Sequence, residues 1–250
     1  MASSLSREEV LDELEFLATV EHALVVEYLS VFCALGHDLE ADEGGATTDE
    51  GRNAASAAST LAMDEMFRLK NISFGLVDAG RFAQLGRADS ISSDASAAIA
   101  LGPPSAAQLE RLLEREQAIA AAVDARYSRL RPAVTSNPVF EEAILDQLRR
   151  IIVDDGPTHA SALAPLRDAL GAVAPATLLR ATRREGVDSF ERRLLDVSDR
   201  SYRLVLAALQ ERFAPQASGS PTLAVSAMEG LDGVNRVLVQ RGLLPPFTFA

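Results

Sequence analysis

Residues 6–35 read SREEVLDELEFLATVEHALVVEYLSVFCAL, and they are the clearest indication of the fold class. Ser6 and Glu9 stand three positions apart, the spacing of a helix capping box. Apolar side chains then recur at intervals of three and four up to Leu35, and Gly36 follows as a stop signal. The segment therefore predicts one long helix whose apolar stripe faces a protein core.

The same helical spacing continues along the rest of the chain, where alternating β-branched runs are absent. We therefore predict an all-α fold without a sheet. After a loop at residues 37–51, further helices are expected at residues 53–77, 105–131, 137–170 with a fault at Gly156-Pro157, from after Pro175 to 213, and 223–241. The apolar tail, residues 244–250, is expected to pack against the fold.

Residues 81–104 lack helical periodicity and end in Gly102-Pro103-Pro104. A connection of this length is uncommon inside a compact domain, but a helical bundle needs one to cross over between parallel neighbours. We expect residues 1–171 to form a four-helix core with this crossover. Residues 172–250 would form a helical extension packed on the core.

Composition excludes several classes of protein. The 250 residues are 48% hydrophobic, enough for a sizeable core, and a net charge of -12 disfavours nucleic-acid and membrane-surface binding. Cys33 is the single cysteine, so an intrachain disulfide is excluded and a cytoplasmic protein is expected. We expect neither a signal peptide nor a membrane-spanning helix, because Glu21 and Glu27 interrupt the most apolar stretch.

Four acidic residues and one histidine lie on the apolar stripes of their predicted helices, where polar side chains are unusual. They are Glu21, Glu65, Glu116, Asp155 and His159. They also lie at similar distances from the ends of their predicted helices. Antiparallel packing would therefore bring them to the same level in the core. Uncompensated carboxylates are costly in a dry core, and two divalent metal ions would balance all four.

Other interpretations of these residues stay open. Any one of the carboxylates could pack its stem inside while its head reaches water. Asp155 could instead cap a helix that restarts at Pro157. Arg68, three residues after Glu65, and a protonated His159 would supply two positive charges without a metal. His22 and Tyr28 are candidates for outer contacts of the site, although His22 points about 100° away from Glu21.

Three short motifs lie on these helices: Val20-Glu21-His22-Ala23 followed by Tyr28-Leu29, Met63-Asp64-Glu65-Met66-Phe67-Arg68-Leu69, and Asp154-Asp155-Gly156 followed by His159. Together they resemble the signatures of ferritin-like proteins of the iminophenyl-pyruvate dimer synthase type, over about residues 10–170. The resemblance implies a ferritin-like four-helix bundle that holds non-haem metal, iron in our prediction. It also implies a role in bacterial secondary metabolism, where many members oxidise amine or amino-acid-derived intermediates.

The chain departs from these signatures at two positions. Arg68 stands where the family has a histidine, and Pro157 stands where it has a second acidic residue. A guanidinium stays protonated and cannot ligate a metal. The site could therefore hold two ions, a single ion bound by Glu116, Asp155 and His159, or none.

Two main functions follow from these alternatives. The first is an iron-dependent oxidase or oxygenase that acts on a small-molecule substrate. The second is a metal-free bundle that catalyses cyclisation, dehydration or elimination, with His159 or a core carboxylate as the general base and Arg68 holding an anionic group. A non-catalytic binding protein is a third class. The apolar residues of the fifth helix favour a homodimer.

Overall fold

The computed structural model describes residues 5–35, 49–82, 85–92, 97–102, 111–156, 159–171, 187–213 and 221–247. The protein is all-α, as predicted. Its helices are α1 (Arg7–Ala34), α2 (Asp49–Asp78), α4 (Leu112–Leu130), α5 (Glu142–Arg149), α6 (His159–Ala162), α7 (Ala164–Leu170), α9 (Ser189–Arg212) and α10 (Pro221–Gln240). A 3₁₀ turn, η1 (Arg131–Ala133), follows α4, and a π-helical turn, η2 (Arg150–Asp154), follows α5.

Some predicted boundaries lie outside the described residues. These are most of the loop at 37–51, the start of the third helix at Ser105, Pro157, the start of the fifth helix after Pro175, and the last three residues of the tail. The second helix begins earlier than predicted, at Asp49.

Helix α1 is the central element of the fold, and its predicted capping box is present. The Ser6 backbone N–H donates to Glu9 Oε2 at 2.7 Å, and the Glu9 backbone N–H donates to Ser6 Oγ at 3.3 Å. By length and composition α1 would be able to cross a membrane, as many core helices of soluble proteins would. In this fold 78% of its most apolar 18-residue window is buried inside the protein.

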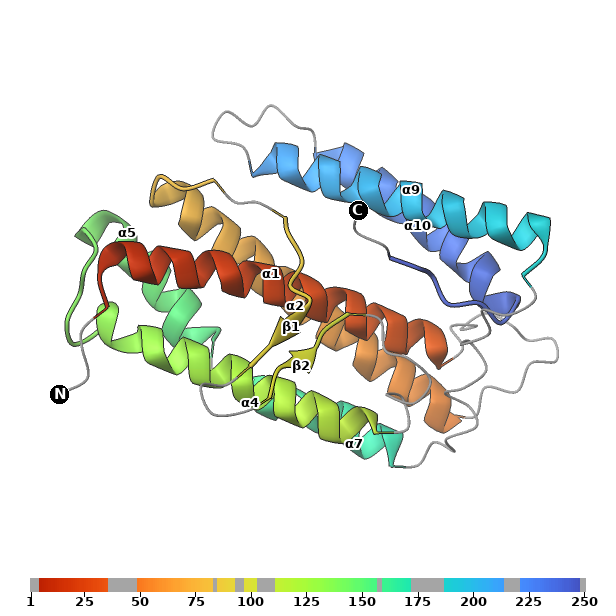
Figure 1. The fold of residues 1–250 in the computed structure, drawn as a ribbon, viewed down its shortest axis with the longest axis horizontal. Coiled ribbons are helices and arrows are strands. Elements are labelled where there is room, and N and C mark those ends of the chain that lie inside the picture. Colours follow the sequence, from red (N-terminus) through yellow and green to blue (C-terminus); the bar gives the residue numbers. More distant parts are fainter. Residues whose placement is uncertain are drawn as a thin grey trace.

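Four helical segments lie alongside one another: α1, α2, α4 and the broken stretch from α5 to α7 (Figure 1). They share one apolar core cluster. The fourth helix was predicted to run from Asn137 with a fault at Gly156-Pro157. It begins only at Glu142, widens into η2 and is interrupted at Asp155-Gly156. A Cβ on Gly156 would lie 2.6 Å from the Tyr127 ring, so glycine lets the interrupted chain press against α4.

The prediction of a fold without any sheet is wrong, because the crossover contains a small two-stranded sheet. Strands β1 (Ser90–Ile91) and β2 (Ile99–Ala100) pair as an antiparallel ladder of two residues each. The ladder lies across α1 and α4 (Figure 1), and the Ala88 backbone N–H donates to Thr19 O of α1 at 2.9 Å. A connection pressed against a helical core must satisfy its backbone groups, and these bonds do so without any β-rich sequence.

The C-terminal helices α9 and α10 pack against each other and against α1, on the side away from α4 (Figure 1). A second apolar cluster joins them to α1: Val26, Tyr202, Val205, Leu231 and Phe247. The described part of the tail packs down as predicted, because Phe247 is buried and its carbonyl accepts from Arg87 Nη1 at 2.5 Å.

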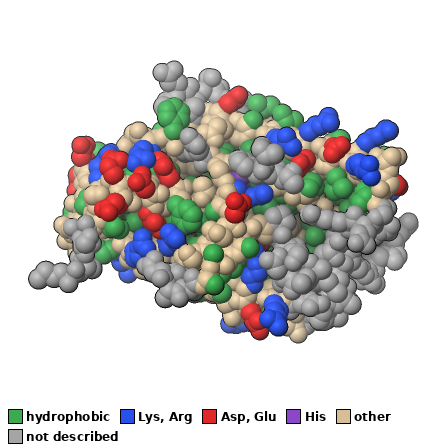
Figure 2. Space-filling model, in the orientation of Figure 1, with side chains coloured by type: hydrophobic (Ala, Val, Ile, Leu, Met, Phe, Trp, Pro, Cys, Tyr) green, Lys and Arg blue, Asp and Glu red, His purple; other side chains and the backbone are tan. Residues whose placement is uncertain are grey.

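Charged side chains on the face shown in Figure 2 are interleaved by sign instead of being separated into large patches. Arg81 illustrates how opposite charges pair at the start of the crossover. It forms ion pairs with Glu8, Asp12 and Glu15 of α1, at 2.7, 2.9 and 2.9 Å. A single exposed ion pair contributes little to the stability of a protein. Here three carboxylates share one arginine, and this network holds the start of the crossover to α1.

Candidate metal centre

Three of the five predicted ligands meet inside the core. Glu21 of α1, Glu65 of α2 and His159 of α6 are buried, and each offers a ligand atom within 4.8 Å of the others. The convergence arises because Glu21 and Glu65 lie on the facing apolar stripes of α1 and α2, while the interruption at Gly156 brings His159 in from the fourth segment. The result is a buried group of two carboxylates and one imidazole.

Asp124 of α4 orients the imidazole of His159. His159 Nδ1 lies 2.9 Å from Asp124 Oδ1, and the backbone N–H groups of His159 and Ala160 donate to the same carboxylate, each at 3.3 Å. Because the carboxylate can only accept, Nδ1 carries a proton and Nε2 faces the cluster. Nε2 lies 3.3 Å from Glu21 Oε1 and 3.4 Å from Glu65 Oε2. Metal-ligating histidines are commonly held by a carboxylate in this way.

Tyr127 of α4 supports the cluster from a second direction. Its hydroxyl donates to Glu21 Oε1 at 2.7 Å, and its ring stacks on His159 with centroids 5.8 Å apart. Neither Tyr127 nor Asp124 was among the site residues predicted from the sequence. One signal was available: Asp124 stands eight residues, about two helical turns, after Glu116, and Tyr127 follows three residues later on the same side of the helix.

Arg68 points into the core, which the sequence had left undecided. Its Nη1 donates to Glu65 Oε2 at 2.7 Å, its Nε donates to the Asp155 carbonyl at 3.0 Å, and only 9% of the residue is exposed. A permanent positive charge therefore lies directly beside the carboxylate of Glu65.

Burial and neighbouring charges shift the pKa values of the three ligands in different directions. Burial raises the pKa of Glu21 to about 7. Burial also raises the pKa of Glu65, but His159 and Arg68 outweigh that effect and bring it below its ordinary value. For His159, burial lowers the pKa, but the charges of Glu21 and Glu65 outweigh burial and raise it well above its ordinary value. The protein's own groups thus favour an ionised Glu65 and a protonated His159.

Glu116 is buried as predicted, but it belongs to a neighbouring charged cluster. Arg115 Nη1 donates to Glu116 Oε1 at 3.1 Å, Tyr28 forms a side-chain hydrogen bond with Glu116, and Arg115 also pairs with Glu27. Among the described residues, Glu116 Oε2 has no hydrogen-bond partner. Burial raises the pKa of Glu116 to about 7, and the charge of Glu65 contributes to the rise. Tyr28 is therefore an outer contact of Glu116, and Glu116 lies within electrostatic reach of Glu65.

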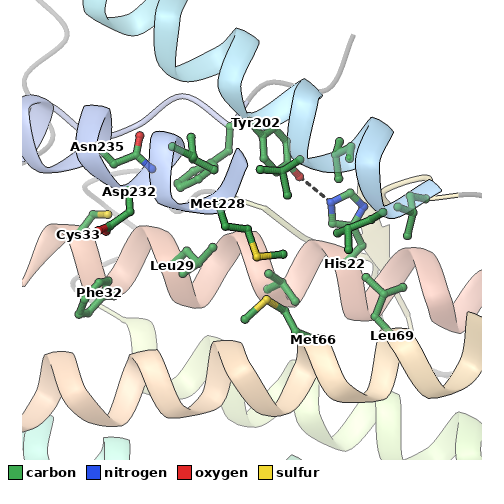
Figure 3. A pocket seen from close by; sticks show the side chains of 17 residues that line it. His22, Leu29, Phe32, Cys33, Met66, Leu69, Tyr202, Met228, Asp232 and Asn235 are labelled. Carbon is green, nitrogen blue, oxygen red and sulfur yellow. Dashed lines mark hydrogen bonds between the residues drawn. The ribbon is translucent and has the colours of Figure 1, made fainter. Parts of the chain in front are cut away.

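Two predicted site residues do not reach the cluster. Asp155 accepts from Asn71 Nδ2 at 3.1 Å, so its prediction as a metal ligand is corrected: the interruption at Gly156 turns its carboxylate toward α2. His22 contacts the Gly86 carbonyl through Nδ1 at 2.9 Å and the Tyr202 hydroxyl through Nε2 at 2.6 Å. It faces a different cavity, under α9 and α10 (Figure 3), because the next residue on a helix points about 100° away.

The donor set fits one divalent transition metal. Carboxylate and imidazole ligands suit iron, manganese and zinc, and the carboxylate of Asp124 completes the arrangement around His159. The charges of the described core also favour a cation. Four buried carboxylates, those of Glu21, Glu27, Glu65 and Glu116, form ion pairs with Arg68, Arg115 and the imidazole of His159. A buried excess of negative groups is stabilised by a positive ion.

Comparison with known proteins adds no assignment for this centre. No protein-family model, curated protein or solved structure matches the chain. The resemblance to ferritin-like proteins stays a prediction from short motifs. The function of the centre therefore has to follow from its own residues and their geometry.

Proposed function

We propose that this protein is a ferritin-like non-haem metal oxidoreductase that binds one iron ion through Glu21, Glu65 and His159. Its substrate would be a small intermediate of bacterial secondary metabolism. One observation carries the proposal: three ligand groups are buried within 4.8 Å of one another in the interior of an all-α fold. Groups of this kind are rarely buried together without a partner that neutralises them.

A single ion is favoured over two because of Arg68. Its guanidinium lies 2.7 Å from Glu65, and Asp155, a further predicted ligand, is bonded to Asn71 instead. A fixed positive charge at that distance repels a second cation. When bound, the iron would supply the one-electron and oxygen chemistry that no side chain of the cluster provides.

The surrounding residues have distinct roles in this proposal. Asp124 keeps Nδ1 of His159 protonated, so that Nε2 is the nitrogen that would release its proton and bind the metal. Tyr127 donates to Glu21 and fixes the direction of its carboxylate. Arg68 keeps Glu65 ionised and would hold an anionic group of the substrate beside the metal.

A metal-free function is the second candidate, and one observation favours it. Arg68 and His159 already form ion pairs with Glu65, and His159 also pairs with Glu21. The cluster is thus partly neutralised by the protein itself. In that state a core carboxylate would act as general base in a cyclisation, dehydration or elimination, with Arg68 holding the anionic group of the substrate.

Metal content distinguishes the two candidates. We expect protein purified without chelators or a metal-loading tag to carry about one iron ion per chain by mass spectrometry, and E65Q and H159Q to lose most of it. The matched control is E114Q, which changes an exposed carboxylate on α4. A wild-type protein that binds no metal, yet converts its substrate without oxygen, would favour the metal-free function.

The substitution Arg68→His tests why only one ion binds. It removes the fixed charge beside Glu65 and supplies an imidazole at the same position. If Arg68 is what excludes a second cation, R68H should take up more metal per chain than the wild type. An unchanged stoichiometry would show that something other than Arg68 sets the number of ions.

A further inference from the structure

A cavity of about 210 Å³ lies between α1 and α2 on one side and α9 and α10 on the other (Figure 3). None of the residues of the proposed metal centre lines it. Their sequence neighbours do: His22 follows Glu21, and Met66 follows Glu65. The two helices therefore present the metal ligands to the core and a separate set of side chains to this cavity.

We propose that this cavity is a binding site for a neutral, mostly apolar small molecule that carries one hydrogen-bond acceptor. Its volume sets the size. An apolar cavity of about 150 Å³ holds a benzene molecule, so this one would take a ligand of roughly eight to twelve non-hydrogen atoms. The site goes beyond the proposed function, because it needs neither the metal nor its ligands.

The walls of the cavity are suited to an apolar occupant. Leucine, valine and phenylalanine side chains make up most of the lining, and Met66 and Met228 face each other across its middle (Figure 3). Methionine is flexible and polarisable, so it adapts to ligands of different shape. An apolar cavity of this size excludes ordered water unless polar groups hold it.

At the end of the cavity near His22, the polar groups form hydrogen bonds with one another. The Gly86 carbonyl can only accept, so His22 Nδ1 donates to it, and His22 Nε2 must accept from the Tyr202 hydroxyl. The Tyr202 oxygen in turn forms a hydrogen bond with Arg87. Both ring nitrogens are thus used, and the apolar part of a ligand fits at this end.

The opposite end offers a hydrogen-bond donor beside an ion pair, in which Arg236 Nε donates to Asp232 Oδ2 at 2.9 Å. The Ser198 hydroxyl donates to Asn235 Oδ1 at 2.7 Å. Because Oδ1 accepts from Ser198, the other polar atom of the amide is Nδ2, which can only donate, and Asn235 is only 7% exposed. Asp232 lines the same end. A ketone oxygen could accept from this amide, whereas a carboxylate would lose its hydration in an apolar cavity whose described lining contains no lysine or arginine.

Cys33, also at this end, would not react with the ligand. Burial and the charge of Asp232 raise the pKa of its thiol to about 12. Because the thiolate is the nucleophile, the bound molecule would be held without a covalent bond.

Methionine methyl resonances test the proposal directly. In protein labelled at the methionine methyl groups, 2-nonanone should shift Met66 and Met228 in a saturable way. Met63, which is 50% exposed on α2, is an internal control that should not move. Nonanoate should bind at least about tenfold more weakly, because its carboxylate would have to be desolvated in an apolar cavity. The shifts should be the same in protein treated with a chelator, which separates this test from that of the metal centre.

Two variants locate the binding. L206W fills the cavity from α9 and should abolish the shifts, whereas L204W, at a position on the same helix that is 64% exposed, should not. N235L keeps the cavity but removes the amide, so it should weaken 2-nonanone and leave the binding of n-nonane unchanged. The proposal is overturned if Met66 and Met228 do not respond, if L206W binds like the wild type, or if nonanoate binds as well as the ketone.

Discussion

Asp124 fixes the orientation of the buried His159 ring, so that Nε2 faces Glu21 and Glu65. Its two carboxylate oxygens accept from the imidazole of His159 and from two backbone N–H groups at the start of α6. The same side chain therefore fixes both the ring and the short helix that carries it. A histidine attached to an interrupted helix would otherwise have several rotamers open to it.

The substitution Asp124→Asn should weaken metal binding without unfolding the protein. An amide keeps the size of the carboxylate but loses its charge, and one of its two arms can no longer accept. We expect metal affinity to fall by about 10- to 100-fold, measured by competition with a chelating dye. The exposed E114Q substitution on the same helix is the control, and equal affinity in D124N and E114Q would contradict the role given to Asp124.

At the scale of the element, glycine acts differently in the fourth helical segment and in α10. Gly156 interrupts the fourth segment where the chain meets α4, and a Cβ there would lie 2.6 Å from Tyr127 and 2.9 Å from the Ile152 carbonyl. Gly230 lies inside α10, and a Cβ added to it would meet no side chain or neighbouring backbone of the described residues within 4 Å. One glycine is needed for close packing, whereas the other only weakens a helix.

Alanine at these two positions should therefore have opposite effects. G156A should lower the free energy of unfolding by about 1–3 kcal/mol, because Tyr127 or the backbone must shift. G230A should raise it by about 0.5–1 kcal/mol through helix propensity. Urea unfolding followed by circular dichroism measures both. The same sign for the two variants would contradict the structural difference between these glycines.

At the scale of the whole molecule, α1 is buried on two sides. Its Glu21 face packs into the four-segment core, and its Val26 face packs under α9 and α10. A hydrogen bond of 2.6 Å between His22 and Tyr202 crosses the second interface. The C-terminal helices thus stabilise the helix that carries a metal ligand, although they contribute none of the three ligands themselves.

Removing the Tyr202 hydroxyl tests this coupling. In Y202F the buried Nε2 of His22 loses its donor, so we expect the free energy of unfolding to fall by about 1–3 kcal/mol. The neighbouring R203A removes only an exposed ion pair with Asp199 and should change it by less than about 0.5 kcal/mol. Denaturant unfolding of both variants makes the comparison. Equal effects would mean that the His22–Tyr202 bond does not hold the two parts together.

Local sequence patterns predict most of the helices, and they predict the inward direction of Glu21, Glu65, Glu116 and His159. These properties depend on local periodicity: a residue on the apolar stripe of a helix must face the core, whatever the core contains. For the same reason the first helix and its capping box were predicted to within a residue.

Which of the inward groups meet depends on how the helices pack, and local patterns do not predict that. Asp155 turns away because the chain is interrupted beside it, and His22 faces the C-terminal helices because α9 covers that side of α1. Asp124 reaches His159 from another helix, across 35 positions of sequence. Such contacts depend on how helices pack and where they break. Helical periodicity gives the direction of a side chain from its own axis, but not the partner that it meets there.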